Sequence, residues 1–221
     1  MKRVIAGVMT TGLLSVGVTG CGTVNNALVT KTKTVEYYRI FDVRTQADRQ
    51  MVIDAASNGL GKNVSDAQEA TPISDSADLP AKPGRFRLVN PLENSQFAAF
   101  AAGGGSVGFK IATCSGAAWT AKAIRNVAGS NHLDLTACLF PYAEGYHLDL
   151  YAVFTKEEGG LMQLSRSMAN AMVGTPEEWT EKTFLDVVRT IKADTNAEIK
   201  YLEGFPKMSG TPWLDKAAGT R

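Results

Sequence analysis

The sequence predicts an α+β domain with a mainly antiparallel sheet and helices packed against it. Three observations support this fold class. Two neighbouring segments within about 132–154 alternate apolar and polar residues and predict a central β-hairpin. A further alternating segment near residue 40 predicts another strand. Helical apolar stripes with start and stop residues lie between and after these segments.

The first part of the domain is expected to be a strand followed by a helix. Residues 35–43 alternate and are rich in β-branched and aromatic side chains, which favours a strand. Thr45 is expected to open a helix, with Asp48 in the role of the capping-box acid. Asn58-Gly59 is expected to end that helix.

The middle of the chain predicts a loop, two short strands and a second helix. The polar, proline-containing stretch 61–84 is either a long surface loop or a linker between domains. We favour a loop, because the single strand and helix before it are too little to bury a core alone. Residues 85–89 and 107–113 predict strands. Residues 115–128 are rich in alanine and predict a helix that ends at Gly129.

The hairpin is the best-defined unit. Leucine and alanine side chains form one face of its first strand, and the second strand has a matching apolar face. These faces coincide only if the loop contains an even number of residues. A four-residue loop places Cys138 opposite His147, whereas a six-residue loop places it opposite Asp149. In both cases these three residues share the face opposite the large aliphatic side chains.

The C-terminal part predicts two helices and a last strand. Residues 161–172 carry an apolar stripe, and Thr175-Pro176-Glu177-Glu178 combines a cap, an N1 proline and a capping-box acid. A short strand is expected near Tyr201. We therefore expect one domain over residues 35–203, followed by an irregular tail at 204–221.

The first 20 residues have the pattern of a secretory signal peptide. Lys2 and Arg3 precede the uncharged, mostly apolar stretch 4–18, which is shorter than the ~20 residues that span a bilayer. Val18-Thr19-Gly20-Cys21 then resembles the lipobox of bacterial lipoproteins. This resemblance implies cleavage before Cys21 and acylation of that residue. More than one acyl chain on Cys21 would meet the requirement for stable anchoring.

The resemblance also implies a location. Gly22 follows the cysteine instead of aspartate, which in lipoproteins of Gram-negative bacteria implies export to the outer membrane. We therefore expect the periplasmic face of the outer membrane in preference to the inner membrane, although the sequence leaves the face of the outer membrane open. Residues 21–34 lack periodicity and are expected to tether the domain. The formal net charge is +1, and the leader removes two cations, so the mature chain is close to neutral. We therefore expect the bilayer and another envelope protein as partners, and no nucleic acid.

The two remaining cysteines allow two interpretations. An exported protein lies in an oxidising compartment, so Cys114 and Cys138 are expected to form a structural disulfide. Alternatively, Cys114-Ser115-Gly116 is similar to the nucleophile segment of cell-wall cysteine endopeptidases of the NlpC type. That resemblance implies a thiolate at a helix start, with His147 as its base. The Gly-Asp-rich segment expected between the two residues in that family is missing here.

The sequence contains no complete catalytic set outside that alternative. It has only two histidines, without the closely spaced ligand pairs of zinc sites, so we expect no metal and no cofactor. The leading hypothesis is a membrane-anchored envelope lipoprotein with a non-enzymatic binding or scaffold domain. Tyr142, Tyr146 and Tyr151 are candidates for its interaction surface, because tyrosine is enriched at interfaces.

Overall fold

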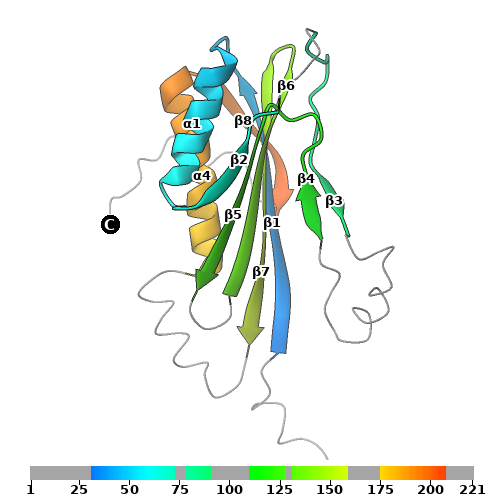
Figure 1. Ribbon diagram of the computed structural model, residues 1–221, viewed down its shortest axis with the longest axis vertical. Coiled ribbons are helices and arrows are strands. Elements are labelled where there is room, and N and C mark those ends of the chain that lie inside the picture. The colour runs from blue at the N-terminus through cyan, green and yellow to red at the C-terminus, as the bar shows by residue number, and fades with distance from the viewer. Residues whose placement is uncertain (1–30, 73–77, 91–109, 128–130, 159–174, 208–221) are drawn as a thin grey trace, which may run out of the picture.

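The computed structural model describes residues 31–72, 78–90, 110–127, 131–158 and 175–207 (Figure 1). The leader, the lipobox with Cys21 and the helix expected at 161–172 lie outside these residues. The described helices and strands are, in chain order, β1 (Lys31–Arg44), α1 (Arg49–Gly61), β2 (Ala67–Ala70), β3 (Arg87–Val89), β4 (Ile111–Thr113), β5 (Trp119–Val127), β6 (Asn131–Tyr142), β7 (Gly145–Glu158), α4 (Pro176–Thr195) and β8 (Glu198–Phe205).

Six of the strands form one antiparallel sheet in the order β2-β5-β6-β7-β1-β8. Strands β3 and β4 pair separately as a small antiparallel hairpin. The sheet and two helices confirm the α+β class with a mainly antiparallel sheet. The central hairpin is also confirmed as β6–β7, where Cys138 lies opposite Asp149 and the strands continue to the pair Tyr142–Gly145. None of the helices in the described part of the chain is long and apolar enough to cross a membrane.

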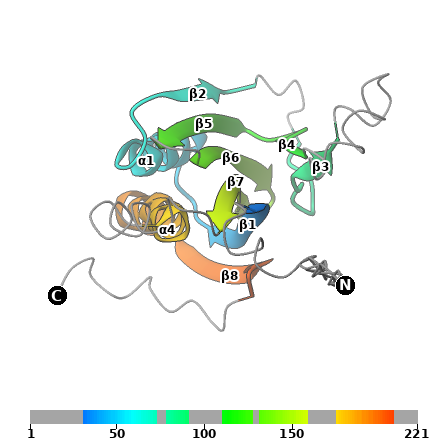
Figure 2. The ribbon, with the colours of Figure 1, turned by 90° about the horizontal axis from the view of Figure 1, so that it is seen from below.

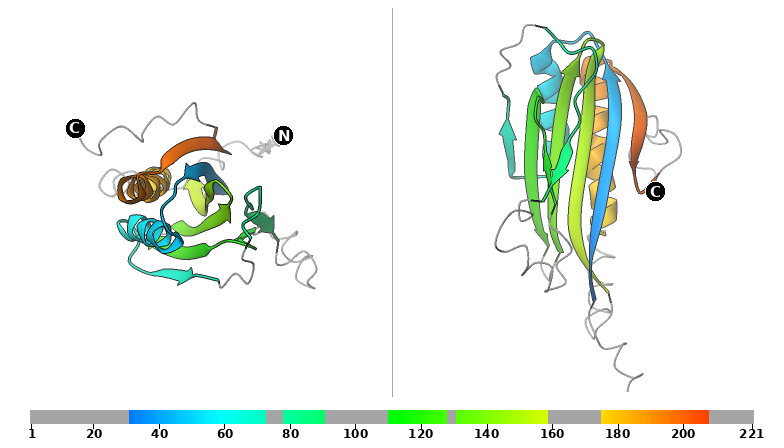
Figure 3. Two further views of the ribbon diagram at one scale, coloured as in Figure 1. Left: turned by 90° about the horizontal axis from the view of Figure 1, so that it is seen from above. Right: turned by 90° about the vertical axis from the view of Figure 1, so that its right-hand side faces the viewer.

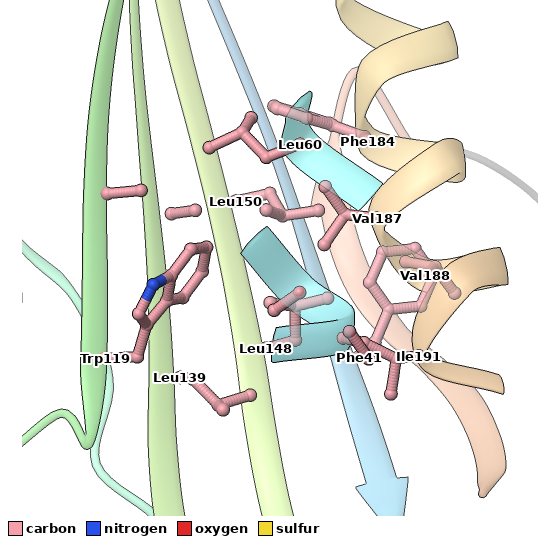
Figure 4. Packing of buried hydrophobic residues seen from close by; sticks show 14 of the residues in the cluster. Phe41, Leu60, Trp119, Leu139, Leu148, Leu150, Phe184, Val187, Val188 and Ile191 are labelled. Carbon is pink, nitrogen blue, oxygen red and sulfur yellow. The ribbon is translucent and has the colours of Figure 1, made fainter. Parts of the chain in front are cut away.

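The main core lies between one face of this sheet and the two helices. Figure 2 shows the sheet curling around α1 and α4, with β3 and β4 on the opposite side. Alternate residues of the strands point toward the helices, as the period of two requires. Figure 4 shows this packing, in which the following side chains are fully buried: Phe41, Leu60, Trp119, Leu139, Leu148, Leu150, Phe184, Val187, Val188 and Ile191.

The ends of α1 differ from the prediction. The helix begins at Arg49, because the Asp48 side chain accepts the Met51 N–H at 3.0 Å and is itself the N-cap. The Thr45 hydroxyl instead accepts the Ala47 N–H in the turn before the helix. The helix also continues past Gly59 to Gly61, since Gly59 has a packing role. A Cβ at Gly59 would lie 2.6 Å from the Val187 Cα of α4.

The start of α4 is as predicted. Thr175 accepts the Glu178 N–H at 3.1 Å, and the Glu178 carboxylate accepts the Thr175 N–H at 3.0 Å. Pro176 occupies the first helical position, where no backbone donor is needed. Local sequence alone therefore determines where α4 begins.

The prediction of a helix at 115–128 is wrong, because residues 119–127 form strand β5. Cys114-Ser115-Gly116 lies in a tight turn, in which Ala117 N–H donates to the Cys114 carbonyl and Gly116 has φ +84°. A positive φ at this position is typical of a type II turn and favours glycine. The alanines of β5 have a high intrinsic helix propensity. Pairing with β2 and β6 on both edges overrides that preference.

Two expected boundaries are also wrong, and the expected loop at 61–84 contains a strand. Strand β1 begins at Lys31, inside the segment expected to be a tether, because residues 31–34 pair with the end of β7. The polar stretch 61–84 contains strand β2, which pairs with β5. Strand β8 extends through Phe205, beyond the predicted end at residue 203.

Candidate functional site

The face of the sheet opposite the helices is where polar groups collect. The pairing of the strands places the side chains of this face in rows that run across the sheet. One row contains Ile40, Asp149 and Cys138 on β1, β7 and β6. Residues 78–90 and the β3–β4 hairpin lie on this side, as Figure 3 shows in its right-hand view. They cover part of the face, and no other described segment covers the rest.

A disulfide fixes β4 to this face. The Cys114 and Cys138 sulfur atoms are 2.00 Å apart and the Cα atoms 5.8 Å apart, which confirms the predicted pair. Cys138 is buried beside Ala117 and Phe140, and Cys114 and Phe86 pack against this small second core. The bond holds the C-terminal end of β4 directly above β6.

A buried carboxylate holds the neighbouring segment. Asp149 is fully buried, and its Oδ2 accepts the Phe86 N–H at 2.9 Å. Its Oδ1 has no hydrogen-bond partner among the described residues. Burial raises the pKa of Asp149 to about 6, although the Phe86 amide and Arg85 act in the opposite direction. The Phe86 ring covers this site and contacts the Tyr151 ring at a centroid distance of 5.6 Å.

A second polar cluster lies at the hairpin end of the sheet. The Tyr142 hydroxyl donates to Asp42 Oδ1 at 2.5 Å, and Arg44 Nε donates to Asp42 Oδ2 at 2.9 Å. His147 Nε2 is 3.9 Å from Asp42 Oδ1. Burial lowers the pKa of His147, and Arg85 acts in the same direction, while Asp42 opposes them. The cluster is therefore an internally paired network in which the imidazole favours its neutral form.

This arrangement removes the basis of the endopeptidase interpretation. The Cys114 sulfur is bonded to Cys138, and Cys114 opens a turn instead of a helix. No helix start is therefore available to stabilise a thiolate. His147 lies next to Asp42 in the paired network at the hairpin end. Among the described residues, no group of three His, Cys, Asp or Glu side chains is arranged to hold a metal ion.

The predicted tyrosine surface is wrong. Tyr142, Tyr146 and Tyr151 are 6%, 8% and 2% exposed and do not form an exposed patch. Tyr146 points toward the helices and belongs to the main core. Tyr142 and Tyr151 lie on the other face, where Asp42 binds the first and the Phe86 ring covers the second. The period of two separates Tyr146 from Tyr151 on the same strand.

The open part of this face forms a groove of about 570 Å³. Its floor consists of the outward side chains of β5, β6 and β7, and its walls are the start of β2 and one side of β4. This volume lies within the range of about 300–1,000 Å³ for ligand sites. We name this space the β4 groove.

Two rows of side chains cross the floor of the β4 groove. The first row contains Ile124, Asp134 and Val153, and it continues to Glu36 on β1. The second row contains Lys122, Thr136 and Tyr151. In the first row apolar side chains alternate with charged ones, whereas the second row is polar.

Lys110 and Tyr151 mark the wall and floor of the β4 groove toward β1. Lys110 Nζ reaches over from the start of β4 to within 3.7 Å of Glu36 Oε1. The Tyr151 hydroxyl is buried and has no partner among the described residues. Burial raises the pKa of Tyr151, and the carboxylates of Glu36 and Asp134 add to that effect. The hydroxyl therefore lies within electrostatic reach of both acids.

Sequence reasoning missed the β4 groove. The interpretation of residues 115–128 as a helix separated Lys122 and Ile124 from the sheet. The alternation of Thr120, Lys122 and Ile124 with the buried Trp119, Ala121 and Ala123 was a strand pattern that could have revealed it. The position of β4 above the sheet depends on a disulfide, so strand alternation alone could not predict the groove wall.

Comparisons with known proteins do not assign the chain to a family. No protein-family model matches it, and no curated protein matches its sequence. Among solved structures it is similar to the crystal structure of a conserved protein from Geobacillus kaustophilus, with 8% identity and a TM-score of 0.29. That similarity covers 74% of this chain and 98% of the other.

Proposed function

We propose that this chain is a lipid-anchored protein of the bacterial envelope whose folded domain binds another envelope protein. The observation that carries the proposal is the sequence Val18-Thr19-Gly20-Cys21 at the end of an apolar leader, ten residues before the domain begins at Lys31. Cleavage and acylation at Cys21 would leave this short connection between the lipid and strand β1.

The length of that connection limits the distance between the domain and the bilayer. Ten extended residues span at most about 35 Å. The domain would therefore stay close to the membrane surface, where it meets other anchored or embedded proteins. Gly22 favours the outer membrane over the inner membrane as that surface.

The polar chemistry of the domain supports binding over catalysis. The Asp42, Tyr142 and Arg44 groups are hydrogen-bonded to one another, and Cys114 is oxidised. The β4 groove, by contrast, offers apolar and charged side chains on one open surface. Such a mixture is typical of interfaces between proteins that associate and separate.

Two measurements test the proposal. Mass spectrometry of the protein from envelope membranes is expected to show a chain that starts at acylated Cys21, and Cys21→Ser is expected to prevent cleavage and acylation. A chain that keeps Met1 or carries unmodified Cys21 would refute the anchor. The control is Cys138→Ser, which removes a different cysteine and leaves the lipobox intact.

Crosslinking in intact cells tests the binding function. A photoreactive side chain placed at Lys122, in the β4 groove, is expected to capture one envelope protein. The same group at Lys200, exposed on strand β8, is the matched control. Absence of any crosslinked protein at both positions would contradict a binding role.

A further inference from the structure

We propose that the β4 groove binds an extended segment of the partner polypeptide, which pairs with β4 as a third strand. This inference rests on the proposed binding function and adds the form and chemistry of the partner. It depends on three features of the described residues: a free strand edge, an alignment of β4 with the floor, and the order of charges along the groove.

Strand β4 has an edge that no described strand occupies. It pairs with β3 along one edge, in a two-stranded sheet. The start of β4 lines the groove and β3 does not, so the second edge faces the groove. Two-stranded hairpins are marginally stable, and a third strand completes their backbone hydrogen bonds. Addition of a partner strand to such an edge is a common mode of peptide recognition.

Strand β4 is aligned with the floor strands. Lys110 reaches the row of Glu36 and Asp134, and Cys114 is bonded to Cys138. The four residue steps from Lys110 to Cys114, which flank β4, therefore cover the same interval as the four steps from Asp134 to Cys138 on β6. A strand added beside β4 would run along β6. Its alternate side chains, about 6.6–6.8 Å apart, would fall on successive rows of the floor.

The charges on those rows determine which charged side chains the added strand should have. The first row presents Asp134, and the second presents Lys122. A cation over the first row and an anion two positions along the strand would complement them. Lys110 shows the same contact within the chain, because its ammonium already lies beside Glu36 of the first row.

The remaining surface favours apolar residues beside that charged pair. Ile111, Ile124 and Val153 line the β4 groove, and Ile124 is 58% exposed. Lys110, Lys122, Asp66 and Asp134 line the groove, and Glu36 lies beside Lys110, so neither sign of charge dominates. The partner segment is therefore mainly apolar, with a lysine or arginine and an aspartate or glutamate two positions apart.

The test uses the full mature chain and three short peptides that alternate valine and threonine. One peptide carries lysine and glutamate two positions apart, the second two lysines and the third two glutamates. Calorimetry is expected to show that the lysine–glutamate peptide binds most tightly. Hydrogen exchange is expected to slow at the backbone amides of Ile111–Thr113 when this peptide is bound.

Charge reversal supplies the specificity test. Lys122→Glu is expected to weaken binding of the lysine–glutamate peptide by about fivefold, which is the upper range for an exposed ion pair. In this variant the double-lysine peptide is expected to bind most tightly. Lys200→Glu, on the exposed edge strand β8, is the matched control and is expected to change neither affinity.

Several outcomes would overturn the inference. Equal affinity for the three peptides, no binding, or binding without protection of the β4 amides would each do so. Binding of octanoate in place of peptide would assign the groove to lipid, and a dimer that Lys122→Glu abolishes would assign it to a second copy. Peptide binding without acylation at Cys21 refutes only the proposed anchor, whereas acylation and crosslinking without peptide binding refute only this inference.

Discussion

The buried carboxylate of Asp149 should make stability depend on pH in a predictable direction. Its pKa is about 6 in the folded protein, compared with 3.8 for an ordinary aspartate. The folded state therefore binds a proton more tightly than the unfolded state. By linkage, the free energy of unfolding rises as the pH falls through 6 and levels off below the unfolded value. The difference in pKa corresponds to about 3 kcal/mol over the whole window.

Substitution of Asp149 by asparagine removes this proton while it keeps an acceptor for the Phe86 N–H. At pH 7.5 the wild-type protein carries a buried charge that the variant lacks, so the variant has its largest relative stability there. Between pH 7.5 and pH 5 the wild-type protein is expected to gain about 1 kcal/mol relative to Asp149→Asn. The pH-independent part of the stability difference depends on how the new amide group fits where the unpaired Oδ1 lies in the wild-type protein. The pH-dependent part does not depend on this fit.

The assay is urea unfolding of both proteins between pH 5 and pH 8. Burial lowers the pKa of His147, so acidification destabilises both proteins through that residue. This contribution cancels in the difference between the two curves. Asp194→Asn, at an exposed position of α4, is the control and should leave the curve unchanged. A difference between Asp149→Asn and wild type that is constant across this range would refute the assignment.

Three further substitutions test the packing around the sheet. Replacing both Cys114 and Cys138 by serine should lower the free energy of unfolding by about 3 kcal/mol, measured by urea unfolding without reductant, because the loop between them is no longer closed; an unchanged midpoint would contradict this. Gly59→Ala should destabilise by about 1–3 kcal/mol through a clash with α4, whereas Gly61→Ala, which meets open space, should be neutral or stabilising in the same thermal melts. Arg39→Met should lower the free energy of unfolding by about 3–5 kcal/mol, because it leaves the partly buried Glu181 carboxylate on α4 without its partner. Methionine at both residues 39 and 181 should restore stability in a double-mutant cycle.

Local signals in the sequence were enough for some elements of the fold. The β6–β7 hairpin followed from strict alternation, and the start of α4 followed from the Thr175–Glu178 capping box. In both cases the information lies within a few residues of the element itself. The disulfide between Cys114 and Cys138 followed from the two cysteines that remain when Cys21 is assigned to the lipobox, and from the oxidising compartment that the leader would imply.

Other features depend on contacts that no local pattern contains. Strand β5 has a helix-favouring composition, but β2 and β6 bind its backbone on both edges. Gly59 looks like a helix stop, yet its missing side chain allows α1 to approach α4. The tyrosines were expected at the surface because tyrosine is enriched at interfaces. Tyr142 is buried because Asp42 accepts its hydroxyl hydrogen at 2.5 Å.

The same tertiary contacts determine whether the sheet can bind anything on its outer face. An exposed sheet face alone offers no depth, and a free β3–β4 hairpin would be marginally stable. The Cys114–Cys138 bond fixes one end of β4 at a set height, and the Asp149–Phe86 hydrogen bond holds the segment that leads into β3. The β4 groove is therefore formed before a partner arrives. A preformed groove does not have to be ordered on binding, so a short partner segment needs fewer contacts to bind measurably.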